Sequence, residues 1–141
     1  MAAGTPQVRR PDEAEEYLTA ERCHILETWN RPEDPSLSVA RARVAPGVTT
    51  RWHRLTGICE RYLILSGKGS VEVGDRLPET VGPGDLVYIP AECPQRITNL
   101  GEHDLVFVAL CTPRFVPEAY ADTEGEAHPA LHDGTQPSGP R

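Results

Sequence analysis

Three side chains in the middle of the chain, His53, Glu60 and Gln95, have the chemistry to hold a metal ion or to move a proton. Side chains two residues apart in a strand point to the same face. His53 therefore shares a face with Leu55, and Glu60 shares one with Tyr62. An imidazole, a carboxylate and an amide oxygen can together bind a divalent cation if they meet at one point. Periodicity alone does not bring them together.

The elements that would position these residues are short β-strands. Residues 23–120 contain recurring runs rich in branched and aromatic residues, separated by turns such as "APG", "SGKG" and "GPGD". The runs are "HILETW", "LSVARARV", "ERYLIL", "GSVEV", "DLVYI", "QRIT" and "DLVFVALC". We expect an all-β sandwich or barrel over 23–120. Residues 1–22 form an N-terminal arm in this interpretation, with a short helix in "PDEAEEYLTA".

The spacing around His53 resembles the first motif of the cupin family. That motif is a glycine, five residues, His-x-His, three or four residues, a glutamate, six residues and a glycine. The chain has Gly47, His53, Glu60 and Gly67 at these intervals, with Leu55 in place of the second histidine.

The spacing around Gln95 resembles the second cupin motif in the same way. That motif is a glycine, five residues, Pro-x-Gly, two residues, a histidine, three residues and an asparagine. The chain keeps Gly84, Pro90 and Asn99 at these intervals, with Glu92 for the glycine and Gln95 for the histidine. The resemblance covers about residues 40–116. It implies a double-stranded β-helix, or jelly-roll barrel.

The family's ligand positions carry over to His53 and Glu60, and Gln95 stands at a third. The resemblance therefore implies a weakened divalent metal site for Fe, Mn, Ni or Zn, with Glu60 also a catalytic proton shuttle. It implies dioxygenase, isomerase, decarboxylase or lyase chemistry on a small organic molecule. The alternative is a cupin that binds or senses a small molecule without metal or catalysis. Whether the protein is an enzyme stays open.

Each ligand candidate also has a structural interpretation. His53 is then a buried, hydrogen-bonded histidine, and Glu60 is a carboxylate paired with Arg51 or Arg61. Gln95 is then a neutral replacement in a site that has lost its metal.

The candidate substrate-binding residues are the neighbours of these positions in the strands. Leu55 either marks a lost metal site or forms an apolar wall for an organic ligand. Arg41 and Arg43 either line an anion site or lie on the solvent face. Arg51 shares the face of His53. Tyr62 and Tyr88 are pocket donors or core aromatics.

The remaining candidates are weaker. A thiolate from Cys59 or Cys93 could replace a missing histidine, but buried free thiols are the default interpretation. His128 and His132 fall in residues 121–141, a Gly-, Pro- and acid-rich stretch that predicts a disordered tail.

Composition limits the partners. The formal net charge of −7 argues against nucleic-acid and anionic-membrane binding. The longest apolar run, residues 105–111, is too short to span a bilayer, and the N-terminus has no signal-peptide pattern. We expect a cytoplasmic protein that binds a small molecule. We also expect a homodimer to which residues 23–45 contribute a strand edge.

Overall fold

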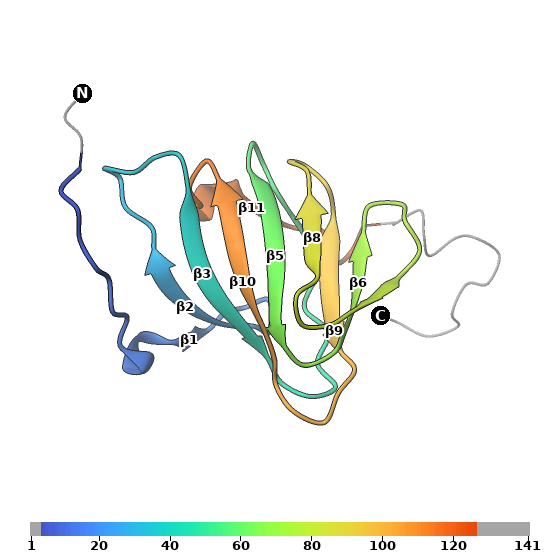
Figure 1. The fold of residues 1–141 in the computed structure, drawn as a ribbon. Helices are drawn as coiled ribbons and strands as arrows, with labels where there is room; N and C mark the ends of the chain where they lie inside the picture. The colour runs from blue at the N-terminus through green and yellow to red at the C-terminus, as the bar shows by residue number, and fades with distance from the viewer. Residues whose placement is uncertain (1–3, 127–141) are drawn as a thin grey trace.

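The computed structural model describes residues 4–126, which form two antiparallel sheets packed face to face in a barrel (Figure 1). The six-stranded sheet has the order β1 (Tyr17–Leu18), β2 (His24–Trp29), β3 (Ser38–Val44), β10 (Leu105–Thr112), β5 (Cys59–Ser66) and β8 (Leu86–Ile89). The five-stranded sheet has the order β11 (Tyr120–Asp122), β4 (His53–Leu55), β9 (Gln95–Asn99), β6 (Gly69–Val73) and β7 (Glu79–Val81). The predicted all-β architecture is confirmed.

Every run predicted as a strand is one, because each is rich in the branched and aromatic residues that favour extended backbone. Strands β1, β7 and β11 were not expected from the sequence. They span only two or three residues each, which is too short to leave a pattern. Within the described residues no helix has the length and apolar character needed to cross a membrane.

The turn that leads from β5 in one sheet to β6 in the other depends on a glycine. Gly67 has a φ of 91°, and a Cβ there would lie 2.9 Å from the carbonyl oxygen of Asp104 and 2.9 Å from Cα of Leu105. Only a residue without a side chain fits this close approach. The register of β5, and with it the inward direction of Glu60, follows from the pairing of β5 with β10 and β8.

The core lies between the sheets and is best seen along β10. Its residues alternate between buried and half-buried positions, and Leu105 and Phe107 point inward. The ring of Phe107 packs against Tyr62 of β5, with centroids 4.3 Å apart. Burying side chains of this size contributes about 1.5–3 kcal/mol each. Tyr62 joins this core to the site described below.

The N-terminal arm runs along the outside of β2 (blue in Figure 1). The predicted short helix is one 3-10 turn, η1 (Glu13–Glu15), capped by the Asp12 side chain, which accepts from the Ala14 amide at 2.9 Å. The arm then pairs with β2 through β1. This pairing covers the strand edge that residues 23–45 were expected to offer a second copy.

The fold continues past the boundary predicted at residue 120. Strand β11 pairs with β4 through residue 122, and the Thr123 amide donates to the Trp52 carbonyl at 2.9 Å. A second 3-10 turn, η2 (Pro117–Ala119), leads into this strand. The predicted tail from residue 127 on, with His128 and His132, lies outside the described residues.

Candidate functional site

The structure brings His53, Glu60 and Gln95 together inside the barrel. His53 on β4 is the register partner of Gln95 on β9, and the Gln95 amide nitrogen donates to Glu60 Oε1 at 2.9 Å. Glu60 comes from β5 in the other sheet, so this hydrogen bond joins the two layers. All three residues are at least nine-tenths buried.

The direction of the Gln95 amide is set by Tyr62. The Tyr62 hydroxyl donates to Gln95 Oε1 in a short hydrogen bond. Burial and the nearby Glu60 carboxylate raise the pKa of Tyr62 well above its usual range. Tyr62 therefore stays protonated and remains a donor. The Gln95 oxygen faces Tyr62, and the NH2 group faces Glu60.

His53 is held by its backbone and by an aromatic neighbour. Its Nδ1 lies 2.8 Å from the Arg51 carbonyl oxygen. Because a carbonyl only accepts, Nδ1 carries the proton and Nε2 keeps a lone pair when the ring is neutral. Glu21 Oε2 lies 3.5 Å from Nδ1, and Tyr120 stacks on the ring with centroids 5.2 Å apart. The Tyr120 hydroxyl is buried without a hydrogen-bond partner.

Within residues 4–126, the groups in hydrogen-bonding range of Glu60 are neutral. Gln95 bonds one carboxyl oxygen, and the Cys111 thiol, a weak donor, lies 3.7 Å from the other. Burial raises the pKa of Glu60, a shift that interaction with the charge of His53 partly opposes. A buried carboxyl of this kind can be protonated near neutral pH and can then donate a proton.

A cavity of about 100 Å³ opens against Glu60. Its walls come from the N-terminal arm, β2, β3 and β10, and include Tyr17, Glu21, Glu27 and Phe115. Three carboxyl groups, those of Glu21, Glu27 and Glu60, line it, and no lysine or arginine does. The cavity therefore disfavours an anionic ligand.

Several predicted substrate-binding residues lie away from this cavity. Arg41 and Arg43 project from the outer side of β3 and form ion pairs with Glu16 of the arm at 2.9 and 2.6 Å. Arg51 pairs with Asp122 at 2.5 Å, and Tyr88 is 54% exposed. These arginines are bound to the protein's own carboxylates. For Arg41 and Arg43 this agrees with a position on the solvent face of the sheet.

The other predicted positions, Leu55, Cys59 and Cys93, also lie away from the cavity wall. Leu55 is buried in an apolar cluster with Ile58, Cys111 and Ala119, beside the site but without lining the cavity. Cys59 lies near the exposed Tyr88, 3.8 Å from its hydroxyl. The Cys93 thiol lies 3.7 Å from the Pro94 carbonyl oxygen. Neither cysteine replaces the missing histidine.

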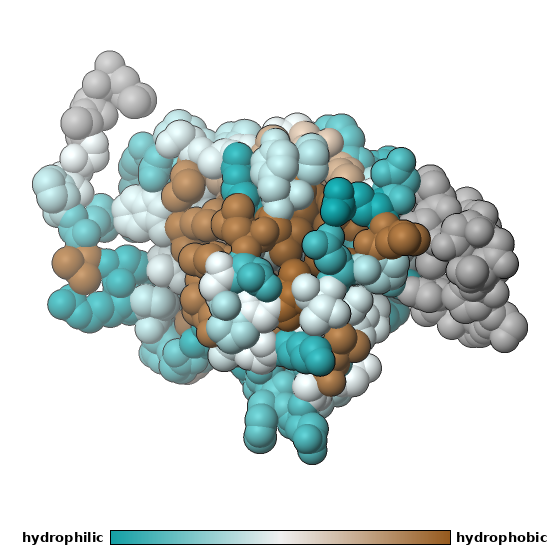
Figure 2. Space-filling model, turned by 45° about the vertical axis from the view of Figure 1, so that its right-hand side comes forward, coloured by the Kyte–Doolittle hydropathy of each residue, from teal (hydrophilic) through white to brown (hydrophobic). Residues whose placement is uncertain are grey.

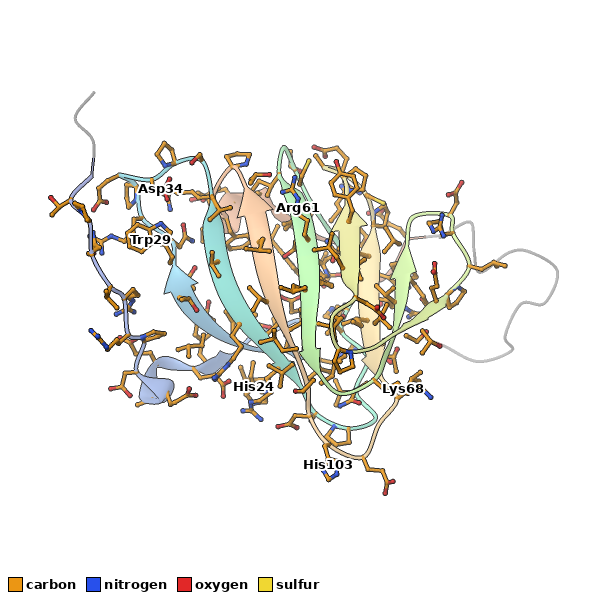
Figure 3. The ribbon with its side chains drawn as sticks, viewed as in Figure 1. His24, Trp29, Asp34, Arg61, Lys68 and His103 are labelled. Carbon is orange, nitrogen blue, oxygen red and sulfur yellow. The ribbon has the colours of Figure 1, made fainter. Side chains whose placement is uncertain are left out.

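The remaining described histidines lie elsewhere. Figure 3 shows His24 and His103 at the lower end of the barrel, while Arg61, which follows Glu60 on β5, lies near the upper end. His24 and His103 therefore cannot complete a ligand set around Glu60.

The sequence analysis missed Glu21, Tyr120 and Cys111. Glu21 reaches His53 from the arm, and Tyr120 does so from β11. Both contacts join segments far apart in the chain, and no motif marks them. Cys111 had a signal, since it ends the alternating run of β10 on the inward face.

Comparison with known proteins agrees with this architecture. Residues 40–111 match the cupin domain family. The chain belongs to the cupin family. The uncharacterized protein MJ1618 of Methanocaldococcus jannaschii is 31% identical over 115 residues, which cover 80% of this chain and 89% of that protein.

Solved structures share the cupin fold. A predicted oxalate decarboxylase from Thermotoga maritima is 21% identical with a TM-score of 0.68, and the match covers 76% of this chain and 99% of that one. Pac13, a nucleoside dehydratase of Streptomyces, is 16% identical with a TM-score of 0.67, covering 82% of this chain and 91% of that one. At such identities the likeness shows the fold alone, and it confirms the predicted double-stranded β-helix.

The donor set of this cupin does not fit the metal that the family implies. The Gln95 group facing Glu60 is an NH2, which cannot ligate a cation, and Leu55 offers no donor. Among residues 4–126 no group of three or more His, Cys, Asp or Glu side chains is placed to hold a metal. His53 Nε2 and the Glu60 carboxylate are two donors, one fewer than a facial triad needs.

Proposed function

We propose that this cupin binds a small neutral or cationic organic molecule in the cavity beside Glu60, and that Glu60 exchanges a proton with it. The observation that carries the proposal is a buried carboxyl that forms part of a cavity wall and, among the described residues, has no guanidinium or ammonium partner. Structural carboxylates at such depth are normally paired with a cation. A carboxyl left with neutral partners is a candidate for acid–base chemistry.

The neighbouring groups support proton transfer. When protonated, Glu60 donates to a ligand oxygen or nitrogen, and when ionised it accepts. The Gln95 amide donates to the carboxyl, and Tyr62 donates to the Gln95 oxygen. This chain of two hydrogen bonds holds the carboxyl in place. A carboxyl that can both donate and accept a proton suits isomerisation or elimination, in which a proton is removed at one atom and delivered at another.

The charge and size of the cavity limit the ligand. A cavity of about 100 Å³ is small beside ligand pockets of roughly 300–1,000 Å³, so it takes only a small fragment. Glu21 and Glu27 add negative potential at the wall. The cavity therefore suits a very small molecule, or the reacting end of a larger one, without a carboxylate or phosphate.

A thermal-shift screen of matched compounds tests the proposal. Small amines, amides and alcohols are compared with carboxylates of the same size, using wild type and Glu60→Gln at pH 5 to 8. We expect stabilisation by the neutral or cationic members, lost or shifted in its pH dependence in Glu60→Gln. Stabilisation only by carboxylates, or hits whose binding is unchanged in Glu60→Gln, would contradict it. Binding without turnover of any hit would favour the sensing alternative.

Metal binding is tested separately, because His53 Nε2 keeps a lone pair and Glu60 offers a carboxylate. Titration of the wild-type protein with Fe(II), Mn(II), Ni(II) and Zn(II) tests it by calorimetry. We expect weak binding in wild type and clearly tighter binding in Gln95→His, since an imidazole restores a third donor. Stoichiometric binding by wild type that is lost in both His53→Ala and Glu60→Ala would establish the metal site instead.

A further inference from the structure

The N-terminal arm forms one side of the cavity beside Glu60. Tyr17, Thr19 and Glu21 of the arm line the cavity together with residues of β2, β3 and β10. Tyr17 is the register partner of Ile25, which also lines the cavity, so β1 continues the inward face of the six-stranded sheet past β2. Without the arm, the cavity would lack this wall and would be open to solvent along β2.

The arm covers the cavity without belonging to the core. Among residues 4–22 no residue is buried, and the first buried residue of the described chain is Cys23. Tyr17 and Leu18 of β1 are 51% and 63% exposed. In Figure 2 the arm, at the left, is mainly teal and white, whereas brown residues gather in the middle of the face turned forward. A segment with so few buried apolar contacts opens at a lower free-energy cost than the core strands do.

Ion pairs hold the arm to the outer side of β3. Glu16 binds Arg43 at 2.6 Å and Arg41 at 2.9 Å, and Glu13 binds Arg41 at 2.7 Å. Hydrogen bonds from Arg43 and Arg41 lower the pKa of Glu16 to about 2, so this carboxylate is ionised at neutral pH. Partly exposed ion pairs are individually weak, so they can break without disturbing the core.

Polar contacts also hold the turn that joins the arm to β2. Glu21 Oε2 lies 3.5 Å from His53 Nδ1. The Arg22 guanidinium donates to the Thr49 carbonyl oxygen at 2.8 Å and pairs with Glu124 at 3.0 Å. His53 lies on β4 in the five-stranded sheet, so the turn bridges the two layers beside the cavity.

We propose that the arm is a strap that opens to admit a ligand to the cavity and closes over it, held by these two polar anchors. In the closed position the cavity measures about 100 Å³. Release of Tyr17 and Thr19 widens it, so a molecule larger than the closed cavity can reach Glu60. Closure returns Glu21 to the wall. The strap deepens the function proposed above, on which the need for ligand entry rests.

Labelling of Cys111 with N-ethylmaleimide, followed by peptide mass spectrometry, tests the strap in the full chain without any ligand. Cys111 lines the cavity and is 4% exposed, so it should react slowly while the arm is closed. Glu16→Gln removes both ion pairs of Glu16 and should speed the labelling by roughly fivefold or more. Arg22→Asn breaks the second anchor and should act in the same direction. Asparagine tolerates the φ of 72° found at this position.

Glu15→Gln is the matched control. Glu15 lies in the same 3-10 turn, but its ion-pair partner is Arg9, which also belongs to the arm. Labelling of Cys111 in Glu15→Gln should therefore stay within about twofold of wild type. Hydrogen exchange of β5 and β10 in the same samples separates release of the arm from unfolding of the barrel, and it should not change.

Two results would overturn the strap. One is equal labelling of Cys111 in wild type and in all three variants. The other is faster labelling in Glu16→Gln and Arg22→Asn that is matched by equally faster exchange of β5 and β10, because Cys111 would then be exposed by unfolding of the barrel. Since no ligand takes part, the strap and the proposed function can fail separately.

Discussion

Two glutamates are buried in this barrel, one in each sheet, and their surroundings differ. Glu72 on β6 is 6% exposed and receives two hydrogen bonds from Arg96, at 2.5 and 3.2 Å. Glu60 on β5 is 8% exposed and has a neutral amide and a thiol as its partners. The two carboxylates are buried to nearly the same extent. Glu72 is hydrogen-bonded to a cation, whereas Glu60 is hydrogen-bonded to neutral groups.

The difference separates a structural carboxylate from one available for chemistry. The guanidinium of Arg96 satisfies Glu72 from one side and lies 4.6 Å from the Trp52 ring centroid on the other. A charge held this way is fixed in place and remains ionised within its pair. Among the described residues, Glu60 has no such cation and it faces a cavity. Protonation or a bound ligand can therefore offset the cost of burying its charge.

The largest expected effect is at the paired carboxylate. Glu72→Gln leaves the buried Arg96 charge without its counter-charge, which typically costs about 3–5 kcal/mol. Urea unfolding followed by circular dichroism measures the loss. Glu79→Gln is the control, because Glu79 forms an exposed ion pair whose loss costs about 1 kcal/mol or less. Equal unfolding free energies for the two variants would mean that Glu72 does not offset the free-energy cost of burying the Arg96 charge.

A smaller effect is expected at the hydroxyl that orients the site. Tyr62→Phe leaves the buried Gln95 oxygen without its donor, at a cost of about 1–3 kcal/mol. Tyr88→Phe removes the hydroxyl of an exposed tyrosine and should change stability by less than about 0.5 kcal/mol. If Tyr62→Phe were as stable as wild type, the Gln95 orientation would not depend on Tyr62, and the argument against a third metal donor would fail.

The fold and part of the site could be predicted from the sequence. The interval from His53 to Glu60 and the alternation of β9 place three side chains on inward faces, and the barrel brings them together. The amide orientation could not be predicted, because it depends on Tyr62, which the sequence allowed as a core aromatic or as a pocket donor. Nor could the contact of Glu21 with His53, since it joins the arm to a strand through tertiary packing alone.

The exposed arginines show the same limit. Strand period places Arg41 and Arg43 on one face but does not say which face is wet. The structure decides this through Glu13 and Glu16 of the arm, which bind the guanidinium groups from outside.

The smallest expected effect at neutral pH is at Glu60 itself, and its sign is opposite to that of Glu72. The folded state raises the pKa of Glu60 above 4.5, so it binds the proton more tightly than the unfolded chain does. The stabilising contribution is complete below pH 4.5 and is lost as the pH rises through the raised pKa. Glu60→Gln carries no such proton, so its stability should rise relative to that of wild type as the pH rises above 4.5.

Urea unfolding of wild type and Glu60→Gln at intervals across that range measures the difference. The other titratable groups near Glu60, those of His53, Glu21 and Cys111, remain in both proteins, so the difference reports on Glu60 and on its coupling to these groups. A wild type that gains stability relative to Glu60→Gln as the pH rises would mean that Glu60 is held ionised, as Glu72 is. Glu60 would then be a second structural carboxylate, and the acid–base role proposed for it would be lost.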